Sequence, residues 1–205
     1  MNALNIETPQ NKTVFIVLTK KENNALLNEQ RYNLCEEVLN EHSFDFVTVD
    51  MEGSKERLNP KSLVKVLGKC PIESHGVDIP EVAAGYLRQE VEDKREQAAS
   101  LEKEYSAMVD KTSIQAQNMA SWISVLKSEA EELEAKIEGE IKPKWLVKRI
   151  LDIAIKFPED EVYVLHFGVE KHLPALKEAF ASVDNVKVAV LDGKKHKTVS
   201  QAVFT

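Results

Sequence analysis

Carboxylate and imidazole side chains follow several predicted strands of this chain. Asp50 and Glu52 come directly after one apolar segment, and Asp78 comes after the next. His166 lies within a later apolar segment, and His172 follows it. Carboxylates and imidazoles gathered in one place can act as general acids and bases, or can hold a divalent metal ion. Each type also has a structural use, because aspartate ends strands as a turn former or helix cap and a lone histidine in an apolar strand is commonly a hydrogen-bonded core residue.

The sequence assigns these side chains to roles in a single centre. Its candidate catalytic residues are Glu52, His172 and Asp78. Glu52 and His172 are the preferred pair, with Glu52 as general base or metal ligand and His172 as metal ligand or acid–base group. Four further residues would bind a ligand or support the centre: Glu22, Asp50, His166 and Gly168. The cofactor would be a divalent metal, which lowers the pKa of its bound water toward about 7 and makes hydroxide available at neutral pH.

These side chains can converge only if the strands before them run parallel. Apolar segments that are typical of strands alternate with helical patterns along the chain. The strands are expected at 13–18, 44–50, 72–78, 161–167 and 186–191, with a further antiparallel edge strand within 197–204, and the helices at 24–40, 60–68, 143–157 and 173–181. This order predicts an α/β fold with a mostly parallel sheet of about five strands, flanked by helices. The carboxyl ends of parallel strands share one edge of a sheet, and ligands bind there.

Residues 81–140 interrupt this alternation. They contain no proline, and small or apolar residues recur at spacings of three and four, from Ala84 to Met108 and again from Met119 to Ile137. The polar stretch 110–113 separates the two series. We expect a long antiparallel helical hairpin, inserted between strands three and four of a single α/β domain spanning 1–205. One continuous helix is the alternative, but about 60 residues would extend roughly 90 Å and leave the apolar seam uncovered.

The apolar seam of the insertion also predicts a partner. A seam of this length needs cover, which the hairpin supplies to itself or a second copy supplies in a homodimer.

The net charge of -7 disfavours binding to nucleic acid. Cys35 and Cys70 form no CxxC motif, so neither a zinc ribbon nor a disulfide framework is indicated. No apolar segment approaches the length of about 20 residues that a membrane helix needs, and the first eleven residues do not resemble a signal peptide. We therefore expect a cytoplasmic protein that does not bind to a membrane.

Several common enzyme motifs are missing from the sequence, whereas four of its segments resemble those of a known superfamily. No GxGxxG, GxxxxGK[ST], HExxH or GxSxG is present, which argues against the common nucleotide-binding, zinc-protease and serine-hydrolase classes. Segment 50–53 resembles an acidic turn, 76–79 a recurrent Gly-Val-Asp segment, 118–123 a Met-Ala helix and 162–172 a late Gly-x-x-His motif. Together they resemble the superfamily of erythromycin esterases, haem-binding ChaN lipoproteins and TraB, GumN and Tiki protease-like proteins.

The resemblance implies a metal-assisted hydrolase, but the chain departs from the superfamily pattern at three places. After the first strand the chain reads Leu18-Thr19-Lys20-Lys21-Glu22, without the glycine and the histidine of the superfamily's Gly-x-x-His-like loop. Gln115 stands where the superfamily has an arginine. The late motif also has one extra residue between Gly168 and His172. A divergent member that has lost catalysis is therefore an open alternative. So is a non-catalytic module that binds a small molecule or peptide, or that binds a protein through the hairpin.

Overall fold

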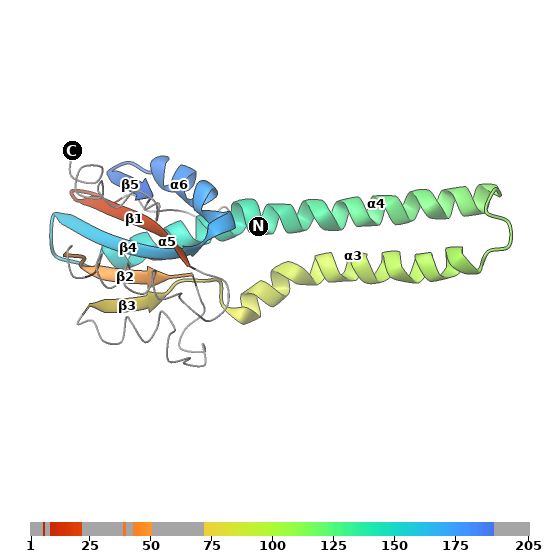
Figure 1. Cartoon of the computed structure of the whole chain (residues 1–205), viewed down its shortest axis with the longest axis horizontal. Helices are drawn as coiled ribbons and strands as arrows, with labels where there is room; N and C mark the ends of the chain where they lie inside the picture. Colours follow the sequence, from red (N-terminus) through yellow and green to blue (C-terminus); the bar gives the residue numbers. More distant parts are fainter. Residues whose placement is uncertain (1–5, 7–8, 22–38, 40–42, 51–71, 191–205) are drawn as a thin grey trace. The chain divides into compact units, whose positions relative to one another are not determined.

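A computed structural model describes residues 6, 9–21, 39, 43–50 and 72–190 of the chain. The chain divides into two compact units, one formed by Met1–Ile79 with Lys142–Thr205 and the other by Pro80–Ile141. The first unit is built on a five-stranded sheet in the order β3-β2-β4-β1-β5, in which all pairs are parallel (Figure 1). The strands are β1 (Thr13–Lys21), β2 (Phe46–Val49), β3 (Glu73–Gly76), β4 (Glu161–Val169) and β5 (Val186–Val190).

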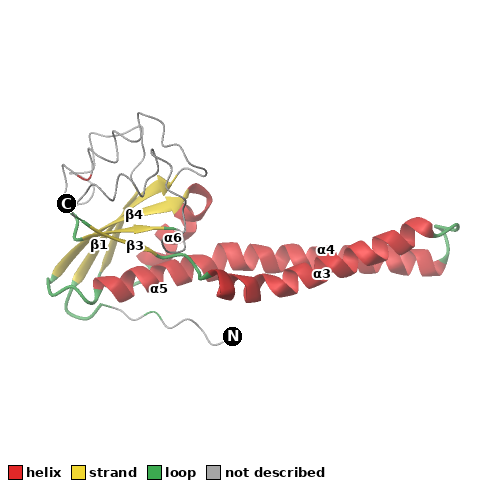
Figure 2. Cartoon of the chain, turned by 90° about the horizontal axis from the view of Figure 1, so that it is seen from below, coloured by secondary structure: helices red, strands yellow, loops and turns green. Residues whose placement is uncertain are grey.

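Two helices pack on one face of this sheet and form the main core with it. They are α5 (Lys142–Ala154) and α6 (Leu173–Ala181), and Figure 2 shows both beside the strands. Val14, Ile16 and Leu18 alternate along β1 and are buried in this core, while Phe15 and Val17 point to the other face and are buried as well. Burial on both faces explains the continuous apolar character of the central strands. The predicted α/β class, with a parallel sheet and flanking helices, is confirmed.

Some predicted elements lie outside the described residues. These are the helix at 24–40, apart from Leu39, which is helical, the helix at 60–68 and the edge strand within 197–204. The helix expected to end at Gly139 does not end there. The chain continues through a π-helical segment, η2 (Ile137–Ile141), directly into α5, and Gly139 lies inside η2.

The second unit consists mainly of two long helices that run side by side (Figures 1 and 2). They are α3 (Glu81–Ala107) and α4 (Ile114–Lys136). The chain leaves the first helix at Met108, and the Ser113 side chain accepts a hydrogen bond from the Ala116 N–H at 3.2 Å, which caps α4. Helix-capping residues therefore break the helix in a junction without glycine or proline. Among the described helices, none combines the length and the apolarity needed to cross a bilayer.

Apolar side chains fill the contact between the two long helices. Val91 of α3 clusters with Ala130 of α4 and Ile137 of η2, and Leu87 and Leu133 pack against this cluster. Each of these residues belongs to the three-and-four series found in the sequence. Lys94 is the polar residue within the α3 series, and its Nζ pairs with Glu129 Oε2 at 2.6 Å.

Candidate functional site

The carboxyl ends of three adjacent strands bring together three of the predicted site residues. Asp50 follows β2, and its backbone N–H donates to the Phe167 carbonyl of β4 at 2.9 Å. Asp78 follows β3, and its Oδ1 accepts a hydrogen bond from the Ile79 N–H at 2.8 Å. His172 ends the short 3-10 helix η3 (Glu170–His172), which follows β4. Because β3, β2 and β4 are neighbours in the sheet, these residues share one edge of it.

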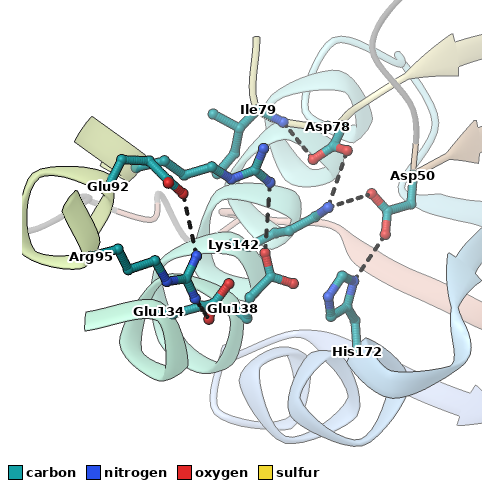
Figure 3. Close-up of polar contacts among 10 residues, drawn as sticks. Asp50, Asp78, Ile79, Glu92, Arg95, Glu134, Glu138, Lys142 and His172 are labelled. Atoms are coloured by element: carbon teal, nitrogen blue, oxygen red, sulfur yellow. Dashed lines mark hydrogen bonds and ion pairs between the residues drawn. The ribbon is translucent and has the colours of Figure 1, made fainter. Parts of the chain in front are cut away.

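The side chains at this edge form a connected chain of polar contacts (Figure 3). Asp50 Oδ2 lies 3.1 Å from His172 Nδ1. Lys142, the first residue of α5, places its Nζ 3.1 Å from Asp78 Oδ2 and 3.5 Å from Asp50 Oδ1. Asp50 and His172 are each only 3% exposed. We name these four residues, Asp50, Asp78, Lys142 and His172, the rim cluster.

The surroundings of the two aspartates shift their pKa values in opposite directions. Burial by itself would raise the pKa of Asp50, but the hydrogen bond with His172 and the charge of Lys142 together hold this pKa well below its usual value. The pKa of Asp78 is raised instead, because burial and the nearby negative charge of Asp50 outweigh the attraction of Lys142. Asp50 is therefore a carboxylate that stays ionised over the whole physiological pH range.

His166 occupies a separate, fully buried position in β4. Thr48 of β2 is its neighbour in the strand register, and the Thr48 Oγ1 lies 3.0 Å from His166 Nδ1. Burial lowers the pKa of His166 to about 4, so the ring is neutral at physiological pH. Among the residues that the structure describes, its Nε2 has no hydrogen-bond partner. His166 is thus a core histidine, which was the structural alternative considered for it.

Gly168 gives space to the side chains around it. A Cβ at this position would lie 2.8 Å from Leu173 Cδ2 and 3.0 Å from His166 Nε2. Both distances are too short for ordinary van der Waals contact, so a side chain here would displace its neighbours. The described contacts of Gly168 explain its presence through packing, and the predicted ligand-binding role is not needed to account for it.

The described side chains do not fit the predicted divalent metal. Within the part of the chain that the structure describes, no three histidine, cysteine, aspartate or glutamate side chains are grouped to hold an ion. The two carboxylates that meet at the rim instead share the ammonium group of Lys142. Glu52 and Glu22 lie outside the described residues. Metal ligation by Glu52 and His172 therefore stays a prediction.

Lys142 is the member of the rim cluster that the sequence did not single out. In the sequence Lys142 belongs to a basic group with Lys144, Lys148 and Arg149. One signal could have identified it, because Asp78 and Lys142 flank the inserted unit Pro80–Ile141. A chain that leaves a folded body and returns to it brings the two flanking segments close together when the insertion is compact. Asp78 and Lys142 meet in this way, at 3.1 Å.

Comparisons with known proteins add no relative. No protein-family model, no curated protein and no solved structure matches the chain.

Proposed function

We propose that the rim cluster is the acid–base centre of a hydrolase of the type that the resemblance implies, with His172 as the general base. The observation that supports this role is the buried contact between Asp50 Oδ2 and His172 Nδ1 at 3.1 Å. A carboxylate on Nδ1 orients the imidazole, selects the tautomer protonated at Nδ1, and stabilises the imidazolium that forms when Nε2 takes a proton. The lowered pKa of Asp50 keeps this carboxylate charged under working conditions.

The proposed reaction is the hydrolysis of an ester. Nε2 of His172 accepts a proton from water as the water oxygen bonds to the acyl carbon. The bond from that carbon to the alcohol oxygen then breaks, and the same proton passes from Nε2 to the leaving oxygen. Water and ester are consumed, and an acid and an alcohol are formed.

Lys142 has a positioning role in this proposal. Its Nζ contacts Asp50 Oδ1 and Asp78 Oδ2, so it holds the Asp50 carboxylate by the oxygen that His172 does not contact. This contact leaves Oδ2 directed at the imidazole. The pair formed by Asp50 and His172 is also weakly screened by solvent, because both residues are 3% exposed.

Matched histidine variants test the proposal. Wild-type protein is screened against acyl esters of different chain length and against lactones, and the active substrate is then measured with His172→Gln, Asp50→Asn and His75→Gln. His75 is the control, because it lies in β3 and pairs with Glu73 at 3.2 Å. We expect a loss of roughly 10³-fold to 10⁴-fold in kcat for the first two variants and no comparable loss for the control. Equal rates for wild type and His172→Gln would refute the role of His172. No turnover of any ester or lactone by folded wild-type protein would refute the hydrolase.

A second candidate function is a protein-interaction role for an antiparallel helical hairpin made by α3 and α4. Cross-helix ion pairs support the antiparallel direction, since Arg95 pairs with Glu134 at 2.6 Å and, further along α3, Glu102 pairs with Lys127, also at 2.6 Å. The later residue on α3 thus pairs with the earlier residue on α4, as expected for antiparallel helices. A specific observation favours interaction with another protein, because large hydrophobic residues on these two helices are exposed although their shared seam is filled. They include Val82, Tyr86, Ile114, Trp122 and Val125.

A further inference from the structure

The first half of α4 and the turn before it are uncharged, which sets them apart from the rest of the chain. Residues 112–126 contain no aspartate, glutamate, lysine, arginine or histidine, although 30% of all residues in the chain are charged. Lys111 and Lys127 bound this segment. The helix here is solvent-exposed on its outer side, where charged residues usually lie.

Within the uncharged segment, apolar residues lie on the outer side of α4 as well as on its inner side. Ala116, Ile123 and Leu126 are the buried residues of the inner side. Ile114, Trp122 and Val125 are 78%, 55% and 41% exposed. Helical spacing places Ile114, Asn118, Ser121 and Val125 on one stripe, at steps of four, three and four residues, with Trp122 next to Ser121. Steps of four and three are the spacing of a helix–helix packing seam.

We infer that this stripe, which we name the outer stripe, is the surface on which two copies of the chain associate. The inference rests on the interaction role proposed for the hairpin, and it names the partner as a second copy bound through α4. The inner seam between α3 and α4 is already filled by residues such as Val91 and Ala130. The interface is therefore on the opposite side of α4 from the seam that the sequence first suggested.

Charge explains why a second copy fits the outer stripe. Each copy has a net charge of -7, so two copies repel each other at most relative orientations. The uncharged segment is a place where identical surfaces can meet without bringing like charges together. A two-fold symmetric contact requires a patch that is complementary to itself, and uncharged helix surface with apolar and small side chains meets that requirement.

The spacing of the stripe also specifies the register. In a two-fold contact between antiparallel α4 helices, the sum of the two facing residue numbers is constant. An axis between residues 119 and 120 places Ile114 against Val125 of the partner subunit and Asn118 against Ser121 of the partner subunit. The midpoint of the uncharged segment, residue 119, falls beside the same axis. The two uncharged segments then lie opposite each other from residue 113 to residue 126.

The mass of the full chain in solution tests the association. Analytical ultracentrifugation over roughly a hundredfold range of concentration should show a monomer–dimer equilibrium. Trp122→Gln should weaken the dimer at least about a hundredfold, because each substitution removes an aromatic anchor on both sides of the two-fold axis. Tyr86→Gln is the matched control, an aromatic residue that is 80% exposed on α3, and it should leave the equilibrium unchanged. Higher salt should strengthen the dimer slightly, because it screens the repulsion between the two net charges.

Single cysteines test the register. In a background with Cys35→Ser and Cys70→Ser, the variants Ile114→Cys and Val125→Cys are oxidised separately and as a mixture. The antiparallel register predicts a disulfide-linked dimer in the mixture and little in either variant alone. Efficient cross-linking of Ile114→Cys with itself would overturn the register in favour of parallel helices.

Other outcomes overturn the inference as a whole. A wild-type chain that stays monomeric at all concentrations refutes it, and so does a Trp122→Gln variant with unchanged dimerisation. A monomer that sediments with phosphatidylcholine vesicles would assign the outer stripe to a lipid surface instead. A failure of the dimer proposal can be distinguished from a failure of the hairpin proposal. Exchanging the charges of Lys94 and Glu129 tests the contact between α3 and α4 within one copy of the chain and does not depend on dimerisation. The dimer proposal is also distinct from ester hydrolysis, which is measured at the rim cluster.

Discussion

The buried histidine of β4 should make the protein lose stability as the pH falls from 6.5 to 4. In the folded state the pKa of His166 is lowered from 6.5 to about 4 by complete burial, whereas an unfolded chain protonates this ring at its ordinary pKa. The unfolded state therefore binds more protons between these two pH values, and the free energy of unfolding falls as the pH decreases through that window. Each pKa unit corresponds to about 1.4 kcal/mol, so the full loss is about 3 kcal/mol. Above pH 6.5 the ring is neutral in both states and contributes nothing to the pH dependence.

Urea unfolding at a series of pH values measures this loss, and a variant isolates it. His166→Asn removes the titrating ring and places an amide near Nδ1, where it can still pair with the Thr48 hydroxyl. The variant has a cost of its own that does not depend on pH, but its free energy of unfolding should fall by about 3 kcal/mol less than that of wild type over the same range. Asp50 interacts with His166 but stays ionised throughout this pH window, and titration of Asp78 affects both proteins alike and cancels in the difference. The same pH dependence in both proteins would show that His166 is protonated in the folded state, and the burial argument would be wrong.

Three further changes test the packing and the ion pairs. Gly168→Ala should lower the free energy of unfolding by about 1–3 kcal/mol because the new methyl group has no space, whereas Gly85→Ala, with nothing within 4 Å of its Cβ, should raise it by about 0.5–1 kcal/mol; thermal unfolding compares the two, and equal effects would contradict the close packing. Lys142→Met should lower the free energy of unfolding by about 3 kcal/mol or more at pH 7, measured with urea, because it removes the cation that both rim carboxylates contact. Part of this loss should be recovered at lower pH as Asp78 takes a proton. An unchanged free energy of unfolding would show that the ion pairs are not formed. Lys94→Glu and Glu129→Lys should each lower the midpoint of thermal unfolding, and the double variant should restore it; additive losses would exclude a direct pair.

The candidate site illustrates how far residue types predict which side chains lie close together. Asp50, Asp78 and His172 were identified because polar residues that follow parallel strands must share one edge, and the structure brings these three together. Within the described residues His172 contacts Asp50, whereas the preferred partner Glu52 lies outside them, so the pair of Glu52 and His172 stays a prediction. Pair identity depends on distances of a few ångströms, and the end of a strand does not specify which side chain turns toward which.

The helical insertion shows the same division between local and long-range information. A break was expected at 110–113 from the polar residues there, and the structure ends α3 just before Met108 and caps α4 with Ser113. The continuation through Gly139 was not expected, because glycine commonly ends a helix when the following chain turns away. Here the helical structure continues through η2 into α5, so the local preference of glycine did not decide where the helix ends.

The sequence by itself determined the α/β class, the parallel strands and the residues available at their ends. These follow from short-range patterns, namely the length and apolarity of each segment and the residues that bound it. Only the tertiary structure decided that the sheet order is β3-β2-β4-β1-β5, that Lys142 lies between Asp50 and Asp78, and that His166 is a neutral core residue while His172 pairs with a carboxylate. Strand order and side-chain pairing depend on which distant segments bury each other's surface, and no local pattern contains that information.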